Sequence, residues 1–123
     1  MDNNSRKLGE TILQKKSKAF AVDIIRFHRV MIERREFELG SQILRSGTSI
    51  GANIKESKNA QSKADFIHKQ SIALKEADET QYWLEIFNEA EVITKEEFEP
   101  LYSKVNELIS MLTASINTSK GRR

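Results

Sequence analysis

The sequence predicts an all-α protein that folds as an antiparallel up-and-down four-helix bundle. Apolar residues recur at three- and four-residue steps in four successive stretches, which is the period of an amphipathic helix. Turn formers are scarce: proline occurs once, at Pro100, and glycine five times in 123 residues. A β-sandwich or barrel needs more of them. The length fits one domain, and four stripes with short connections favour up-down-up-down order.

The first helix is expected over residues 17–35. Its apolar stripe is broad and contains Phe20, Ile24, Phe27 and Met31, with Ala21, Ile25, His28 and Ile32 beside them. Residues 8–16 either extend this helix or form a loose arm. We therefore divide the chain into a flexible or helical N-terminal arm over residues 1–16, a bundle over 17–118, and a disordered basic tail over 119–123.

The second helix is expected over residues 39–59, although its centre is rich in small residues. Gly47 and Gly51 each cost a helix about 1 kcal/mol relative to alanine, so a loop is the competing prediction. The flanking apolar period continues through both glycines, which favours a helix. Small residues four apart also let another backbone approach closely.

The third and fourth helices have the clearest limits. The third is expected over residues 63–89, and its main seam contains Phe66, Gln70, Ala73, Ala77, Leu84 and Phe87. The fourth opens with a capping box, because Thr94 is followed three residues later by Glu97. Its apolar stripe contains Leu101, Val105, Leu108, Leu112 and Ile116. Helix three carries apolar residues on more than one side, which often marks a subunit contact.

Charge is unevenly distributed along a chain whose net charge is only +2. Residues 1–35 hold nine Lys and Arg against four Asp and Glu, whereas residues 75–99 hold nine Asp and Glu against two Lys. A basic element and an acidic one could attract each other within or between subunits.

The composition favours a cytoplasmic protein. Cysteine is absent, which suits a reducing compartment and removes thiolate metal sites. The first seven residues are polar, unlike a secretory signal. Charges interrupt every apolar run before it reaches the ~20 residues of a membrane span, so no membrane partner is expected.

No catalytic or cofactor constellation is found in the sequence. A di-iron bundle needs two Glu-x-x-His motifs, but the two histidines, His28 and His68, follow Ile25 and Asp65 at that spacing. No orienting group stands beside a serine and histidine as a nucleophile requires, and no glycine-rich phosphate loop occurs. We expect neither an enzyme, nor a metal, nor a cofactor.

Polar residues of helices two and three are expected to meet. If the two helices pack antiparallel, Arg45 or Asn53 could reach Glu76 or Glu79. A satisfied polar network of this kind fixes helix register more than it adds stability. Paired carboxylates for acid–base catalysis would instead need a pocket, which the sequence does not predict.

The basic residues of the first helix are candidates for nucleic-acid contact, together with a basic tail. Cationic side chains neutralise phosphates and make binding salt-dependent. The helix contains no helix-turn-helix signature and no base-stacking aromatic motif. The candidate contact residues are Lys15, Lys16, Lys18, Arg26, Arg29, Arg34 and Arg35.

Four segments carry a family resemblance that extends over residues 17–118. They read LRSGTSIGANIKE at 44–56, QSKADF at 61–66, ALKEADET at 73–80 and YWL at 82–84. They resemble the signature of bacterial four-helix bundle proteins related to the intervening-sequence proteins encoded within 23S ribosomal RNA genes. The signature positions, to which we assign a structural role, are Arg45, Ser46, Gly47, Ser49, Gly51, Asn53, Glu56, Glu76 and Glu79.

The resemblance implies a ring-like homopentamer without a defined activity. Related accessory proteins of diversity-generating retroelements bind a reverse transcriptase and nucleic acid through a strongly basic surface, from which this chain departs in its net charge of +2 and its acidic third helix. We therefore expect a non-catalytic homo-oligomeric scaffold or binding module. The alternative is an RNA- or DNA-binding accessory protein that uses the basic first helix and partners nucleic acid or a nucleic-acid-processing protein.

Overall fold

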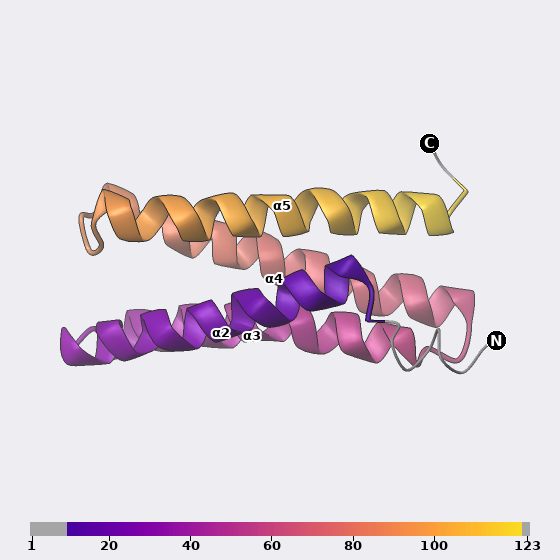
Figure 1. The fold of residues 1–123 in the computed structure, drawn as a ribbon, viewed down its shortest axis with the longest axis horizontal. Coiled ribbons are helices and arrows are strands. Elements are labelled where there is room, and N and C mark those ends of the chain that lie inside the picture. Colours follow the sequence, from indigo (N-terminus) through magenta and orange to yellow (C-terminus); the bar gives the residue numbers. More distant parts are fainter. Residues whose placement is uncertain (1–9, 122–123) are drawn as a thin grey trace.

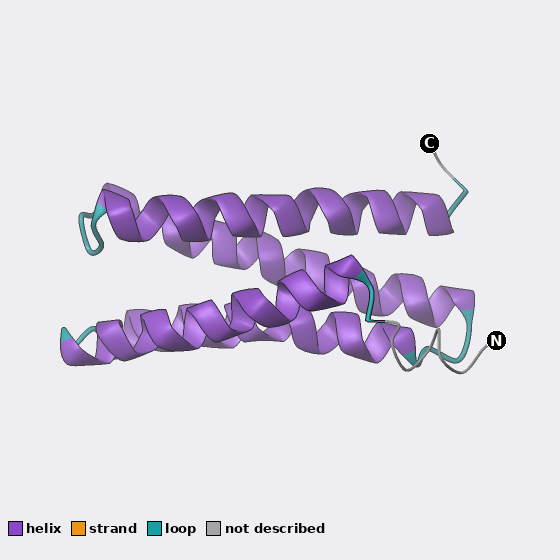
Figure 2. Cartoon of the chain, viewed as in Figure 1, coloured by secondary structure: helices purple, strands orange, loops and turns teal. Residues whose placement is uncertain are grey.

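The computed structural model describes residues 10–121 and contains four helices and no strand within that range (Figure 2). The helices are α2 (Ile12–Glu33), α3 (Phe37–Lys58), α4 (Lys63–Glu89) and α5 (Lys95–Ser119). The predicted all-α class is confirmed, and the four helices are consistent with a four-helix bundle.

The helices lie along the long axis of the molecule, and successive connections fall at alternate ends (Figure 1). Helix α3 contacts α2 and α4, and α5 contacts α4 and α2. No Cα atom of α2 lies within 8 Å of a Cα atom of α4. These two helices therefore occupy diagonal corners of the bundle.

Capping boxes open α2 and α5. The Thr94 hydroxyl accepts a hydrogen bond from the backbone N–H of Glu97, and the Glu97 carboxylate accepts from the N–H of Thr94, as the sequence predicted. Thr11 and Gln14 make the same pair at the start of α2. The helix expected from residue 17 thus begins at Ile12, so residues 12–16 extend it. Residues 1–9 of the expected arm, and Arg122 and Arg123 of the expected tail, lie outside the described residues.

Two helices end in left-handed residues that are not glycine. Arg35 follows α2 with φ 63° and Glu91 follows α4 with φ 58°. At each end the next N–H bonds back five residues, from Glu36 to the carbonyl of Met31 and from Val92 to that of Phe87. Because φ changes sign at Arg35, α2 ends at Glu33 and not at the predicted residue 35. The chain re-enters a helix at Phe37, earlier than the predicted residue 39.

The glycines of α3 lie inside the helix against α2, so the competing loop prediction is wrong. A Cβ atom added to Gly47 would meet Cγ1 of Ile24 at 2.8 Å. One added to Gly51 would meet the backbone oxygen of Ser17 at 3.2 Å. Close packing offsets the low helix propensity of glycine at these positions, by the Ile24 side chain at Gly47 and by the Ser17 backbone at Gly51.

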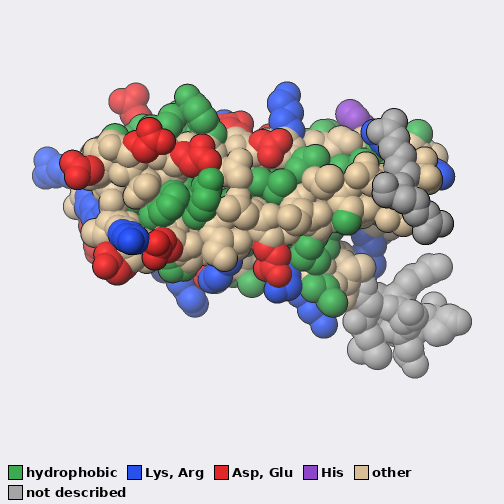
Figure 3. Space-filling view, turned by 90° about the horizontal axis from the view of Figure 1, so that it is seen from above, with side chains coloured by type: hydrophobic (Ala, Val, Ile, Leu, Met, Phe, Trp, Pro, Cys, Tyr) green, Lys and Arg blue, Asp and Glu red, His purple; other side chains and the backbone are tan. Residues whose placement is uncertain are grey.

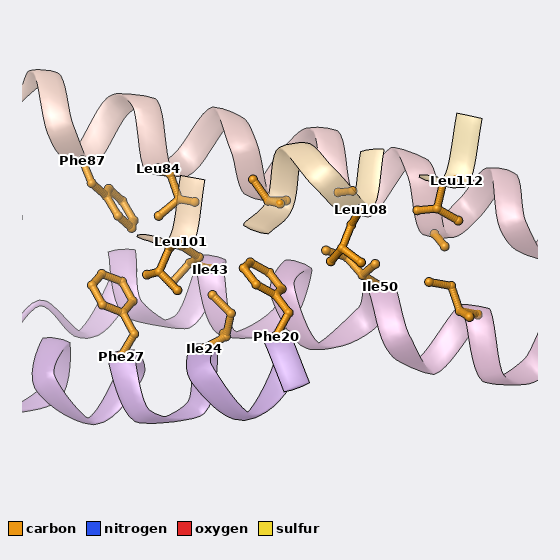
Figure 4. Packing of buried hydrophobic residues seen from close by; sticks show 14 of the residues in the cluster. Phe20, Ile24, Phe27, Ile43, Ile50, Leu84, Phe87, Leu101, Leu108 and Leu112 are labelled. Carbon is orange, nitrogen blue, oxygen red and sulfur yellow. The ribbon is translucent and has the colours of Figure 1, made fainter. Parts of the chain in front are cut away.

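The core is formed by one buried face from each helix (Figure 4). On α2 the buried residues include Phe20, Ile24, Phe27 and Met31, the centre of the predicted stripe. The neighbouring positions differ from the prediction, because Ile25 is 42% exposed and Ile32 is 38% exposed. The buried face of α2 is therefore narrower than the apolar stripe in the sequence.

Candidate binding surfaces

The predicted ion pair between α3 and α4 is present. Arg45 donates to the carboxylate of Glu79, with 2.7 Å between Nη2 and Oε2, and the same oxygen accepts from the indole Nε1 of Trp83 at 3.2 Å. Arg45 Nη1 also lies 3.9 Å from the Oε1 atom of Glu76, which is buried and accepts no hydrogen bond from the described residues. The Glu79 carboxylate thereby binds the guanidinium of Arg45 from α3 and the indole of Trp83 from α4. These two contacts fix the side of α4 that faces α3.

Buried polar side chains continue this contact along the bundle. Thr80 Oγ1 lies 2.9 Å from Ser46 Oγ, and the Gln70 amide donates to Ser57 Oγ at 3.3 Å and accepts from Ser115 Oγ at 2.6 Å. Only Ser46 was among the predicted site residues. Gln70 could have been predicted from the sequence, because it is a polar residue within the predicted apolar seam of the third helix. A polar side chain that is buried at such a position needs hydrogen-bond partners.

The other signature residues of α3 make local or exposed contacts. Ser49 donates to the carbonyl of Arg45 at 2.6 Å, and Asn53 donates to the carbonyl of Ser49 at 2.8 Å. Glu56 pairs with Lys69 of α4, with 3.1 Å between Oε1 and Nζ. Of the two residues expected to reach the carboxylates of α4, Arg45 does so, whereas Asn53 bonds within its own helix.

The predicted basic surface of α2 is divided by ion pairs. Lys16 pairs with Glu107 of α5 at 3.1 Å, and Arg34 binds both carboxylate oxygens of Glu97 at 3.0 and 2.5 Å. Lys18 lies 3.9 Å from Glu10. Within the described residues the remaining predicted cations, all exposed, form no ion pair; they are Lys15, Arg26, Arg29 and Arg35.

A groove with a volume of about 450 Å³ runs between α2 and α3. Its small residues Ala21, Gly51 and Ala52 leave room where the two helices approach. Three lysines line it, Lys18 from α2 and Lys55 and Lys58 from α3. One acid, Glu10, lines it too, and its Oε2 atom lies 3.9 Å from Lys18 Nζ, so the lining has a net positive charge. A basic groove of this kind can take an anionic ligand. Lys55 and Lys58 were not predicted as binding residues from the sequence, because their approach to α2 depends on helix packing.

Large apolar side chains are exposed on the outward faces of the helices. The most exposed are Ile12, Val22, Ile25, Ile32, Phe37 and Tyr82. Acidic side chains gather toward the end of the molecule that holds the α4–α5 connection (Figure 3). The exposed acidic residues in that region are Glu89, Glu91, Glu96 and Glu99.

Within residues 10–121, no three histidine or acidic side chains are grouped as a metal site would need. The ring of His28 instead lies against Gly40, where an added Cβ atom would meet Cδ2 at 3.3 Å. No helix of the described chain is long and apolar enough to cross a membrane.

Comparisons with known proteins agree with the resemblance seen in the sequence. The family model described as 23S rRNA-intervening sequence protein matches residues 10–114. A crystal structure from Bacteroides thetaiotaomicron, described as a protein with unknown function from the S23 ribosomal protein family, is 48% identical with a TM-score of 0.83. That match covers 85% of this chain and 98% of the other. No curated protein shows a significant match. The chain therefore belongs to the family of 23S rRNA-intervening sequence proteins.

Proposed function

We propose that this protein is a non-catalytic, homo-oligomeric binding module of the cytoplasm, built as a ring of five antiparallel bundles. The exposed apolar residues of α2 carry this proposal. Val22, Ile25 and Ile32 are between 38% and 42% exposed on a helix whose opposite side forms the core. Side chains of this type gain free energy when another surface covers them, at about 25 cal/mol per Å² of apolar area.

The order of contacts supports the antiparallel arrangement. On α3 and α4, Arg45 pairs with Glu79 and Glu56 pairs with Lys69, so partner numbers fall on one helix as they rise on the other. On α4 and α5, Gln81 pairs with Asn106 and Glu85 binds the hydroxyl of Tyr102. Seven of the nine signature residues then serve the packing of α3 against its neighbours. The other two, Ser49 and Asn53, bond within α3.

The mass of the purified protein in solution tests this proposal. Size-exclusion chromatography coupled to multi-angle light scattering, over a series of protein dilutions, should give the mass of five 14.1-kDa chains. The mass of a single chain at every concentration would contradict it.

A second function, nucleic-acid binding, is favoured by the groove between α2 and α3. Its lysines come from both helices, and the exposed cations Lys15, Arg26 and Arg29 lie on the same helix as Lys18. A polyanion with regularly spaced phosphates fits such a surface. The family description names a ribosomal RNA, which makes structured RNA the first ligand to test.

Fluorescence anisotropy with labelled structured RNA and duplex DNA, at low and physiological salt, tests this second function. Lys18→Gln with Lys55→Gln should weaken binding and reduce its salt dependence, because each phosphate that is no longer neutralised lowers the salt slope by about 0.7 to 0.9. Lys63→Gln with Lys75→Gln, which neutralises two exposed lysines outside the groove, is the matched control. Equal binding by all three proteins, or none by the wild type, would reject the function.

A further inference from the structure

The outward side of α2 presents an apolar and basic stripe. Val22, Ile25, Arg29 and Ile32 follow one another at steps of three, four and three residues, so they share one face of the helix; we call them the α2 stripe. Arg26 and the exposed Glu33 lie on the same face, four residues after Val22 and four after Arg29, so the face has a net positive charge. The core residues of the same helix occupy other positions in the same turns, so the stripe is not needed for the core.

The outward side of α4 presents a stripe with a net negative charge, since two of its residues are acidic and one is a lysine. Lys75, Asp78, Tyr82 and Glu89 are exposed and follow at steps of three, four and seven residues; we call them the α4 stripe. Tyr82 is 56% exposed at its centre. Neither Asp78 nor Glu89 forms an ion pair within residues 10–121. The exposed acids at the α4–α5 connection add negative charge at the same end.

We propose that the α2 stripe of one chain docks on the α4 stripe of a second copy. The interface rests on the homo-oligomer proposed above and specifies how that oligomer is joined. The α2 stripe is largely apolar, and the α4 stripe offers it one large exposed hydrophobic side chain, Tyr82. The net charges of the two stripes are complementary. Two copies of the α2 stripe would bring two net positive charges together, and two copies of the α4 stripe two net negative charges.

The diagonal placement of α2 and α4 makes this contact head-to-tail. The two helices share no Cα pair within 8 Å, so the stripes cannot meet within one chain. Each subunit then has one donor side and one acceptor side, which is a heterologous interface. Such interfaces close into rings when the rotation between subunits closes.

Nucleic acid is the competing occupant of the α2 stripe. A phosphate backbone would use Arg26 and Arg29, but it offers no apolar surface to Val22, Ile25 or Ile32, which a second copy offers through Tyr82. The two occupants can therefore be separated experimentally.

Site-directed cross-linking tests the pairing directly, because the sequence contains no cysteine. Ile25→Cys with Tyr82→Cys, treated with a short bismaleimide, should give a ladder of covalent multimers on a denaturing gel. Both engineered thiols are exposed, on diagonal helices, and a link within one chain would add no multimer band to the gel. Each single-cysteine variant should stay monomeric on the gel. Covalent dimers from either single variant would indicate a symmetric contact and overturn the proposal.

Charge reversal with rescue tests the electrostatic part. The double variant Arg26→Glu with Arg29→Glu should abolish the oligomer peak. The double variant Asp78→Lys with Glu89→Lys should abolish it too. A chain that carries all four changes should form the oligomer again. Lys63→Glu with Lys120→Glu makes the same charge change as the first pair at exposed positions elsewhere and should leave the mass unchanged. Restoration also shows that the loss in the parent variants was not misfolding.

The outcomes separate this interface from the function on which it rests. A wild-type protein that is monomeric in solution rejects the homo-oligomer and the interface together. An oligomer whose mass survives every reversal, with no ladder from the double-cysteine variant, rejects the interface alone. If Arg26→Glu with Arg29→Glu keeps the mass but abolishes RNA binding, the α2 stripe is a nucleic-acid surface and the proposal is overturned.

Discussion

Arg35 adopts a backbone conformation that its side chain disfavours. With φ at 63° it occupies the left-handed region, where a Cβ atom costs roughly 1–2 kcal/mol. Arg35→Gly should therefore raise the free energy of unfolding by about 0.5–1 kcal/mol, the gain being reduced by the greater freedom of glycine in the unfolded chain.

Arg35→Ala is the control for this prediction, since it removes the charge and keeps the Cβ atom. Thermal unfolding followed by circular dichroism should place Arg35→Gly above both the wild type and Arg35→Ala. An equal rise in both variants would assign the effect to charge and not to the backbone.

The bidentate pair between Arg34 and Glu97 makes stability depend on pH. Hydrogen bonding to the Arg34 guanidinium holds the pKa of the Glu97 carboxyl below its ordinary value. Because the pKa of Glu97 is lower in the folded than in the unfolded chain, the ionised carboxylate stabilises the fold at pH values above its unfolded pKa of about 4.3. This stabilisation is lost as the pH falls through the folded pKa. Both side chains are partly exposed, so the contribution should be under about 1 kcal/mol.

Glu97→Gln isolates this charge, because glutamine can still accept the hydrogen bond from Thr94 in the capping box. Denaturant unfolding should show the variant less stable than the wild type at pH 7. The difference should shrink as pH falls from about 5 toward 2. A difference that is the same at pH 7 and pH 2 would contradict the assignment.

The packing of α3 on α2 depends on the absence of side chains at two glycines. Gly47→Leu should destabilise the fold by at least about 1–3 kcal/mol, because even its Cβ atom would meet Ile24 at 2.8 Å. Ser41→Leu is the matched control, since Ser41 is exposed on the same helix and does not line the groove between α2 and α3. Urea midpoints of the two variants test this, and equal midpoints would contradict the close-packing account.

Each helix could be predicted from the sequence, because the period of apolar residues and the residues that begin or end a helix are local properties of the chain. The limits of α4, Lys63 and Glu89, agree with the prediction because a serine cap precedes it and its seam continues without interruption. The start of α2 was missed because the capping box of Thr11 and Gln14 lay outside the strongest apolar period. The end of α2 was missed because a positive φ at Arg35 follows from the turn that α3 imposes and not from its residue type.

The surfaces were less predictable than the helices. Arg45 was correctly expected to reach the carboxylates of α4, because the spacing of both helices constrained the pair. The lysine groove was not expected, because it depends on which side of α3 faces α2. The exposure of Ile25 likewise depends on where α3 and α5 lie around α2, and an apolar period alone does not give that.

At the scale of the whole molecule, the proposed contact between a basic and an acidic face should respond to salt. Raising the ionic strength from about 0.05 to 1 M shortens the Debye length to about 3 Å and weakens attraction between exposed charges. Sedimentation velocity at fixed protein concentration should show partial dissociation at high salt. Assembly that strengthens with salt would indicate an interface dominated by apolar contact.

The diagonal placement of α2 and α4 has a consequence for mixtures of intact and damaged subunits. A chain that has lost only its α2 stripe or only its α4 stripe can still bind an incomplete ring through the other stripe. The next subunit then finds no intact stripe to bind at that position. A small proportion of such chains, produced in the same cell as the wild type, should act as terminators and deplete complete rings out of proportion to their number. Because one ring draws on several chains, loss of one face should be genetically dominant, whereas loss of both faces should be recessive.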